Sequence, residues 1–261
     1  MKKLLALLAA VLLVVCAATA VHAGENARVY VTISDENGKL AVAQEEIVVH
    51  DADGDGSITV NDAMIVAHDK FYDGGADAGY ETATSEYGIS MNKLWGTENG
   101  GSYGYYVNGT AAWSLADPIS DGDFVDAFVY TDLEAWSDMY ACFEPRFVTS
   151  GTAELTLTGA GFDENWNPVA VPVEGAEITL NGAKTGVFTD EQGKASVPVD
   201  TNAGRIVISA VSDSQILVPP VAIVEGEGTA PQTGDLSAVI AAAAVLSLGA
   251  ALLVKKHTDE R

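Results

Sequence analysis

Cysteine is nearly absent from this chain of 261 residues. There are two, and Cys16 lies within an apolar N-terminal run from Leu4 to Ala20. If that run is removed, Cys142 is the only thiol left, so no disulfide can form within the chain. We therefore expect stability to come from packed cores and from any bound metal ion. A lone cysteine of this kind is more often a small buried apolar side chain than a reactive group.

Basic side chains are also scarce. The chain has 13 Lys and Arg against 37 Asp and Glu. Between residues 24 and 233 the counts are 8 and 34, which gives a formal charge of 8 − 34 = −26. Nucleic acids and anionic membranes would be repelled by such a surface, so we exclude both as partners. Most of these carboxylates need no role beyond keeping the protein soluble.

Histidine is too rare to supply an obvious catalytic group. His22 and His257 lie near the two ends, which leaves His50 and His68 in the body of the chain. Neither is near Cys142 in the sequence, and no two of the many carboxylates stand out as a glycosidase pair. The sequence therefore indicates a protein that is not an enzyme.

The two ends of the chain carry matching targeting signals. Residues 1–23 have a basic start, an apolar stretch and Ala23 as a cleavage position, as in a secretory signal peptide. Near the other end, an apolar run at 236–254 precedes a basic tail at 255–261. Because positive charge remains on the cytoplasmic side of a membrane, we expect the residues between these signals to lie outside the cell.

The residues before the second apolar run are Pro231, Gln232, Thr233 and Gly234. They resemble the sorting signal of the sortase-anchored LPxTG family of Gram-positive surface proteins, with Ala230 in place of the usual Leu. The resemblance implies that sortase cuts after Thr233 and joins the chain covalently to peptidoglycan. Residues 225–235 would then be a short stalk carrying the sorting motif, and 236–254 a temporary transmembrane helix. The alternative is a permanent membrane anchor, because about 20 apolar residues span a bilayer.

Between the signals, apolar and polar positions alternate as they do in β-strands. The clearest runs are Ala27–Ser34, Gly104–Val107, Phe124–Tyr130 and Ala176–Leu180. One helix is expected over Val60–Tyr72, and a loop at 74–79. We predict a mainly β chain with two domains. The first, 24–148, is α+β, and the second, 149–224, is an antiparallel β-sandwich.

The sharpest chemical motif is the twelve-residue loop 51–62. A hard cation such as calcium takes six to eight oxygen ligands, and alternate aspartates on a tight turn converge on one point. Gly56 permits the sharp turn. We expect a calcium ion here, held by Asp51, Asp53, Asp55, the carbonyl of Ser57, Thr59 and Asp62. The simplest alternative is an acidic turn that binds no metal.

This loop is similar to the calcium loop of EF-hands. A strand precedes it, so it resembles one half of a dockerin, a loop followed by a helix. True dockerins carry two such halves, and this sequence has a single copy. We therefore expect a structural calcium site inside another domain, and not a cohesin-binding module.

Four short motifs around the loop resemble those of transcobalamin-like C-terminal domains, the DUF4430-type family. They are Ile58–Met64, Tyr87–Ser90, Tyr103–Gly109 and Ile119–Val125. The resemblance implies a small β-grasp-like fold that presents a ligand, and in animal relatives the domain helps to enclose cobalamin. This chain lacks the large helical domain that forms the other half of that pocket.

Aromatic residues gather near one of these motifs. A platform for a sugar or a corrin-like plate could be formed by Trp95, Tyr103, Tyr105, Tyr106 and Trp113. The alternative is that alternate members simply fill the core of the sheet, since a strand points every second side chain to one face.

In the second domain, residues 172–180 and 189–195 resemble the Ig-like and prealbumin-like spacer modules of bacterial surface proteins. The sequence thus suggests a calcium-binding surface protein that presents a binding domain on a spacer. Its ligand would be a glycan, a host protein or a corrinoid. The alternative hypothesis is a structural stalk component of the surface layer with no ligand of its own.

Overall fold

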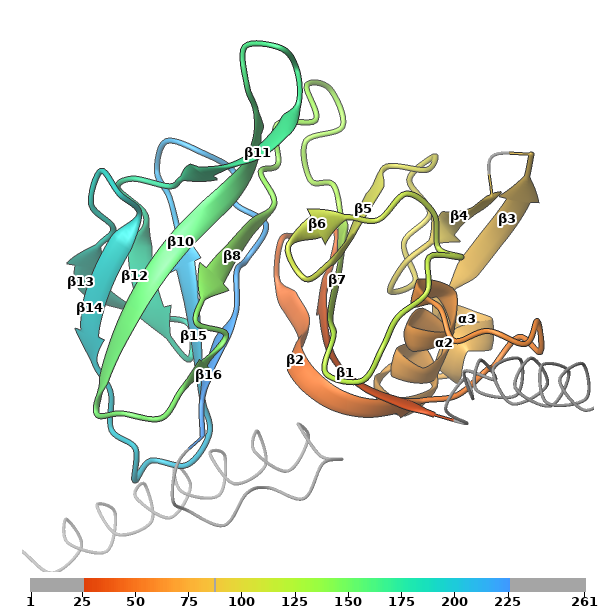
Figure 1. Cartoon of the computed structure of the whole chain (residues 1–261), viewed down its shortest axis with the longest axis horizontal. Helices are drawn as coiled ribbons and strands as arrows, with labels where there is room; N and C mark the ends of the chain where they lie inside the picture. Colours follow the sequence, from red (N-terminus) through yellow and green to blue (C-terminus); the bar gives the residue numbers. More distant parts are fainter. Residues whose placement is uncertain (1–25, 87, 226–261) are drawn as a thin grey trace, which may run out of the picture.

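The computed structural model describes residues 26–86 and 88–225, which form two β-rich units side by side (Figure 1). The prediction of a mainly β chain is confirmed. The predicted signal peptide, sorting motif and apolar run 236–254 lie outside the described residues. Among the helices in the described ranges, none is long and apolar enough to cross a membrane. The described residues form three core clusters, whose buried members lie between Ala27 and Val224.

The first unit is a five-stranded sheet with helices on one side. The strand order is β2 (Leu40–Val49), β1 (Ala27–Ser34), β7 (Phe124–Val129), β5 (Tyr103–Val107) and β6 (Thr110–Ala111). Strands β1 and β7 are parallel, and the other pairs are antiparallel. Beside this sheet lies a hairpin of β3 (Glu81–Ser85) and β4 (Gly88–Lys93).

The first unit holds both helices of the described residues. Helix α2 (Val60–Phe71) ends one residue before the predicted Tyr72, and its buried face packs against β1 and β2. The segment 74–79 was expected to be a loop, but Gly75–Gly79 forms a short helix, α3. Its first turn is held by Asp69, whose side chain accepts a hydrogen bond from the Ala76 N–H at 2.8 Å. That contact satisfies an amide that a helix start would otherwise leave unpaired.

The second unit consists of two sheets around one core. One sheet has the order β11 (Pro168–Pro172), β10 (Thr152–Phe162) and β14 (Lys194–Pro198), with β8 (Ala141–Glu144) also paired to β10. The other has the order β13 (Ala183–Phe188), β12 (Glu177–Leu180), β15 (Ile206–Val211), β16 (Ala222–Val224) and β9 (Phe147–Val148). All its pairs are antiparallel except β16–β9, which is parallel.

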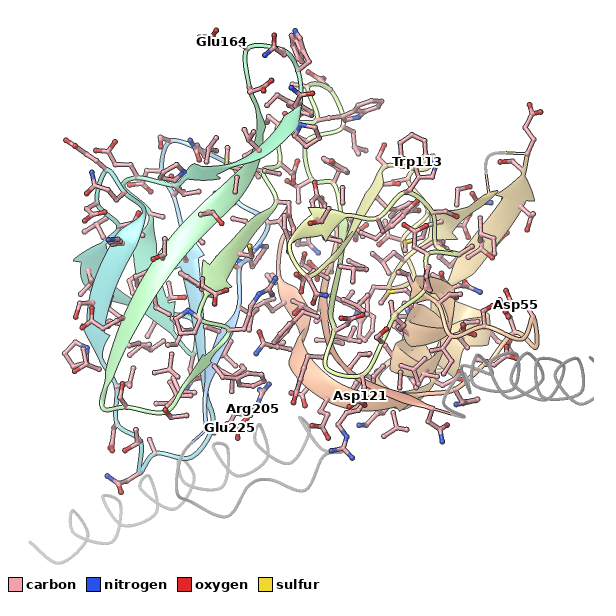
Figure 2. All side chains as sticks on the ribbon, viewed as in Figure 1. Asp55, Trp113, Asp121, Glu164, Arg205 and Glu225 are labelled. Carbon is pink, nitrogen blue, oxygen red and sulfur yellow. The ribbon has the colours of Figure 1, made fainter. Side chains whose placement is uncertain are left out.

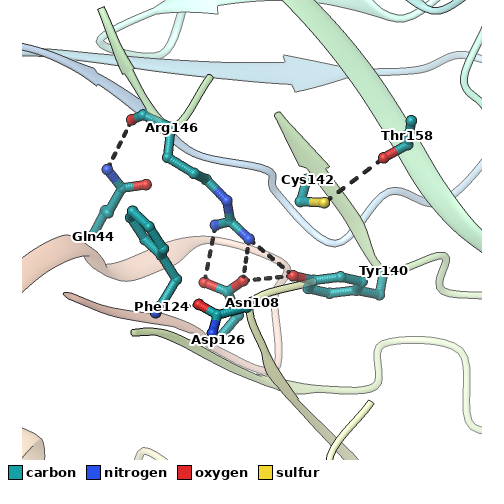
Figure 3. Close-up of polar contacts among 8 residues, drawn as sticks. All are labelled: Gln44, Asn108, Phe124, Asp126, Tyr140, Cys142, Arg146 and Thr158. Carbon is teal, nitrogen blue, oxygen red and sulfur yellow. Dashed lines mark hydrogen bonds and ion pairs between the residues drawn. The ribbon is translucent and has the colours of Figure 1, made fainter. Parts of the chain in front are cut away.

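Strand pairing places the change between units earlier than the predicted boundary at Val148. Strand β8 pairs with β10, and β9 pairs with β16, so both belong to the second unit. The last strand of the first sheet, β7, ends at Val129. Sequence alternation could not show this, because β8 and β9 are only four and two residues long. Cys142 lies on β8 and is half-buried, with its Sγ 3.8 Å from Thr158 Oγ1 (Figure 3).

A buried polar contact joins the two units. Arg146, on the turn between β8 and β9, pairs with Asp126 of β7 at 2.8 Å, and both side chains are about nine-tenths buried. The hydroxyl of Tyr140 donates a hydrogen bond to the same carboxylate at 2.6 Å. Figure 3 shows Gln44 on the other side of Arg146, where the Gln44 amide donates to the Arg146 carbonyl at 2.9 Å. The first unit is thereby fixed against the second.

Candidate metal centre

Three aspartates converge on the loop between β2 and α2. Carboxylate oxygens of Asp51, Asp53 and Asp55 all lie within 4.8 Å of one another, so this cluster could hold a metal ion. Asp51 is half-buried, whereas the other two are exposed. Figure 2 shows Asp55 at the edge of the first unit that faces away from the second. The alternating spacing noted in the sequence therefore does bring these three side chains together.

The loop is curled around the Asp51 carboxylate. Its Oδ1 accepts hydrogen bonds from the N–H groups of Gly54 at 2.8 Å and Asp55 at 3.1 Å, and its Oδ2 accepts one from Gly56 at 2.9 Å. Gly54 and Gly56 adopt left-handed φ angles of 79° and 92°, which glycine tolerates without a steric penalty. The turn that directs the three carboxylates inward thus depends on these two glycines.

Asp62 and Thr59, which the sequence analysis proposed as ligands, are placed differently. Asp62 is fully buried and is not part of the carboxylate cluster. Its Oδ1 accepts from the N–H of Ala52 at 2.7 Å, and its Oδ2 accepts from the N–H and hydroxyl of Thr59, both at 2.8 Å. Thr59 is the N-cap of α2 and forms a capping box with Asp62. Both residues fix the start of the helix to the loop. Ser57 is exposed, and its N–H donates to Asp55 Oδ1 at 2.8 Å.

The C-terminal half of the loop is docked on the segment 115–119. Ile58 accepts a hydrogen bond from the Ile119 N–H at 3.0 Å. The first amides of α2, those of Val60 and Asn61, donate to the carbonyls of Asp117 at 3.1 Å and Leu115 at 2.8 Å. Helix-start amides usually lack intrahelical partners, so the segment 115–119 both satisfies them and positions the loop.

A chain of contacts leads from the loop into the interior. The Asn61 amide donates to Asp53 Oδ2 at 2.8 Å, and the Tyr80 hydroxyl donates to Asn61 Oδ1 at 2.9 Å. Burial raises the pKa of Tyr80, which keeps this hydroxyl protonated and able to donate. The Tyr80 ring stacks on His68, with ring centroids 5.1 Å apart. His68 in turn accepts a hydrogen bond at Nε2 from the Trp95 N–H at 3.1 Å.

The stability of the first unit should fall as the pH drops below about 6.5, because of His68. This side chain is fully buried, and burial lowers its pKa from the ordinary value of 6.5. Its Nδ1 lies 2.7 Å from the Met64 carbonyl and its Nε2 accepts from Trp95, so the ring must be neutral. The unfolded chain takes up the proton first as the pH falls, which favours unfolding down to the lower folded-state pKa.

Urea unfolding between pH 7.5 and 5.5, at one fixed calcium concentration, would measure this effect. The His68→Gln variant should be less stable at every pH but should lose this dependence, because glutamine does not titrate. The exposed His50 provides the matched control, and His50→Gln should keep the wild-type dependence. If His68→Gln and the wild type show parallel pH curves, His68 is not the group responsible.

The proposed aromatic platform is divided between the two faces of the sheet. Tyr103 is buried and Tyr105 half-buried on the face that packs against the helix side, where Trp95 also packs. Tyr106 points to the other face and stacks on Tyr140 of the second unit, with centroids 3.6 Å apart. Four of the five residues are therefore largely used in packing, as strand alternation allows.

Trp113 alone is left free of this packing. Its side chain is 90% exposed, on the chain that follows β6 (Figure 2). Its N–H donates to Asp117 Oδ2 at 2.7 Å, and the carbonyl of the same Asp117 accepts from Val60 at the start of α2. The carboxylate loop, the start of α2 and the exposed indole are therefore linked through one residue.

Two further tryptophans are exposed, and the sequence analysis did not single them out as candidate binding residues. Trp136, in the loop between β7 and β8, is 66% exposed, and Trp166, in the turn between β10 and β11, is 81% exposed. Figure 2 labels Glu164 in the same turn. Both tryptophans have left-handed φ angles, which are uncommon for aromatic residues. An aspartate begins each turn, so an aspartate three or four positions before a tryptophan is the local pattern that could have indicated them.

Comparisons of this chain with family models, with curated proteins and with solved structures found no match.

Proposed function

We propose that this chain is a calcium-binding surface protein that presents a ligand-binding domain outside the cell. Support comes from the converging carboxylates of Asp51, Asp53 and Asp55 on a loop of EF-hand length. Calcium is the favoured ion because the cluster offers only oxygen atoms, which hard cations prefer. The Ser57 carbonyl, water and a rearranged Asp62 would complete the coordination shell.

Anchoring to the cell wall by sortase completes the proposal, with the signals at 1–23 and 231–234 as its basis. The first unit would be a β-grasp-like, transcobalamin-like domain, and the second an Ig-like spacer that holds it away from the wall. The parallel β1–β7 pair with α2 across the sheet supports the former, and two sheets around one core support the latter.

Calcium would act by holding the ligand surface in place. The loop is docked on the segment 115–119, and Asp117 of this segment holds the backbone of the exposed Trp113. A metal ion that fixes the loop therefore also limits the motion of this indole. Preorganisation of this kind increases affinity because less freedom is lost when the ligand binds. Glycans, host proteins and corrinoids all offer apolar faces on which an indole can stack.

Retention on immobilised glycans, mucin and a corrinoid tests this proposal. We expect the protein to bind one of these matrices in millimolar calcium and to be released by EGTA. Trp113→Ala should abolish retention, whereas Trp166→Ala, at a similarly exposed tryptophan on the second unit, should leave it unchanged. Substitutions at such exposed positions have little effect on folding.

A structural stalk is the second candidate function. Its support is the buried Arg146–Asp126 pair, which joins the two units rigidly, together with the division of the predicted aromatic platform between two faces. A stalk would be retained on none of these matrices, with or without calcium.

A further inference from the structure

A groove of about 750 Å³ lies between the two units, away from the carboxylate loop. One wall is the edge strand β2, through Leu40, Ala41 and Ala43. The other is the outer face of β12 and β15, where Thr179 pairs with Ser209 and where Val207 and Val211 also line the groove. This volume lies in the range of small-molecule sites, and interfaces between units are a common place for them.

The walls of the groove are fixed in position. Segment 216–218 closes one side of the groove through two backbone hydrogen bonds to Met139. The Ile216 carbonyl accepts from the Met139 N–H at 2.8 Å, and the Val218 N–H donates to the Met139 carbonyl at 2.9 Å. On the β2 side, Arg205 pairs with Glu45 at 3.2 Å and donates to the Ala43 carbonyl. Together with the Asp126–Arg146 pair, these contacts hold the two walls apart at a set distance, so the groove is largely pre-formed.

The lining is apolar and partly open to solvent. Val211 is 41% exposed and Ile216 is 44% exposed, and Leu217 and Pro219 lie beside them. Small-molecule sites are commonly lined in this way, mainly by apolar side chains with a few polar groups among them.

The charge of the lining distinguishes it from the rest of the molecule. The chain has 37 acidic residues, yet none of the described residues that line the groove is acidic, and Lys39 is the one among them that carries a charge. Lys39 is exposed, and within the described ranges its ammonium group makes no ion pair. A free cation therefore stands beside an apolar groove on a strongly acidic protein.

We propose that this groove binds an amphiphilic organic anion, with its apolar body between β2 and β15 and its carboxylate or sulfonate on Lys39. The apolar side chains would bury the apolar body of the ligand, and the unpaired Lys39 ammonium would attract its negatively charged end. A cationic ligand would find no carboxylate among the described lining residues to pair with, and a neutral ligand would make no ion pair with Lys39. This site does not involve the metal loop and so stands apart from the function proposed above.

Fluorescence titration with 8-anilinonaphthalene-1-sulfonate, an apolar anion, tests the site on a protein of residues 24–229. We expect one saturable site, from which decanoate displaces the dye at a concentration at least about five-fold lower than decanol does. Lys39→Gln should remove this difference, and Val211→Trp, which fills the groove from a partly exposed position, should abolish dye binding. Lys194→Gln removes an equal charge from an exposed position at the start of β14 and should behave like the wild type.

Three results would overturn the proposal. Equal displacement by decanol and decanoate would mean that the groove takes neutral apolar molecules. Unchanged binding in Val211→Trp would place the dye elsewhere. Loss of the dye in the Asp51→Ala/Asp53→Ala variant would place it at the metal loop. Because the groove is separate from that loop, binding should persist in EGTA, even if the protein takes up no calcium at all.

Discussion

Calorimetric titration of calcium into residues 24–229 should show saturable binding at one site, and the Asp51→Ala/Asp53→Ala variant should lose it. These two residues supply two of the three converging carboxylates, and Asp51 also organises the turn through three backbone hydrogen bonds. A ligand that binds only the folded state stabilises it by about 2.7 kcal/mol at one hundred times its Kd. For a chain of this size that corresponds to a rise in Tm of roughly 5–10 °C.

A control with equal loss of charge separates coordination from general electrostatics. Asp73, between α2 and α3, and Asp77, within α3, are exposed carboxylates of the same unit but outside the cluster. Asp73→Ala/Asp77→Ala should bind calcium with nearly the wild-type affinity. Magnesium should bind more weakly, because it requires a smaller octahedral site and gives up its water reluctantly. Absence of both heat and thermal shift at millimolar calcium would make the loop an acidic turn and favour the stalk.

Much of the fold could be predicted because its signals are local. Alternating residues in Ala27–Ser34 identified β1, and the apolar positions within Val60–Tyr72 identified α2. Helix α3 was missed because Gly75–Gly79 has no apolar periodicity of its own. It is held by Asp69 and by the ring of Tyr72, which packs closely on Gly79. Those contacts come from neighbouring elements, so the five residues alone could not show them.

The candidate site was predictable for the same reason, and only in part. The Asp-x-Asp-x-Asp spacing with two glycines specifies a converging turn, and the structure has one. What Asp62 does is decided by competition. Its carboxylate could turn toward a cation, but in this structure the amides of Ala52 and Thr59 and the Thr59 hydroxyl occupy it. A sequence motif specifies which residues occupy the loop positions, but it does not specify which hydrogen bonds their side chains form in the folded protein.

The interface between the units had no sequence signal. Asp126, Tyr140 and Arg146 lie on different elements, and Gln44 is 102 residues away from Arg146. None of them belongs to a motif, and each would be read as an ordinary solvated polar residue. Tertiary packing alone brings them together and buries them, and this burial gives them a large effect on stability.

Arg146→Met should lower the free energy of unfolding by about 3–5 kcal/mol, because it leaves the carboxylate of Asp126 buried without its cation. Asp126 is 6% exposed, and after the change the Tyr140 hydroxyl would be the one charge-stabilising side chain left to it among the described residues. Burial raises the pKa of Tyr140, and the adjacent Asp126 raises it further, so this hydroxyl remains a donor and cannot neutralise the carboxylate. Urea unfolding followed by tryptophan fluorescence would measure the loss.

Two matched variants separate the cost of an unpaired charge from the loss of a contact. Arg28→Met removes an exposed pair with Glu46, at 3.5 Å, and should cost no more than about 1 kcal/mol. The double variant Arg146→Met/Asp126→Leu removes both buried charges and should recover much of the stability lost in Arg146→Met. If the double variant is as unstable as the sum of its two single variants, the penalty is not that of a buried unpaired charge. A loss below 1 kcal/mol for Arg146→Met would mean that water reaches Asp126, and the two units would then be free to move against each other.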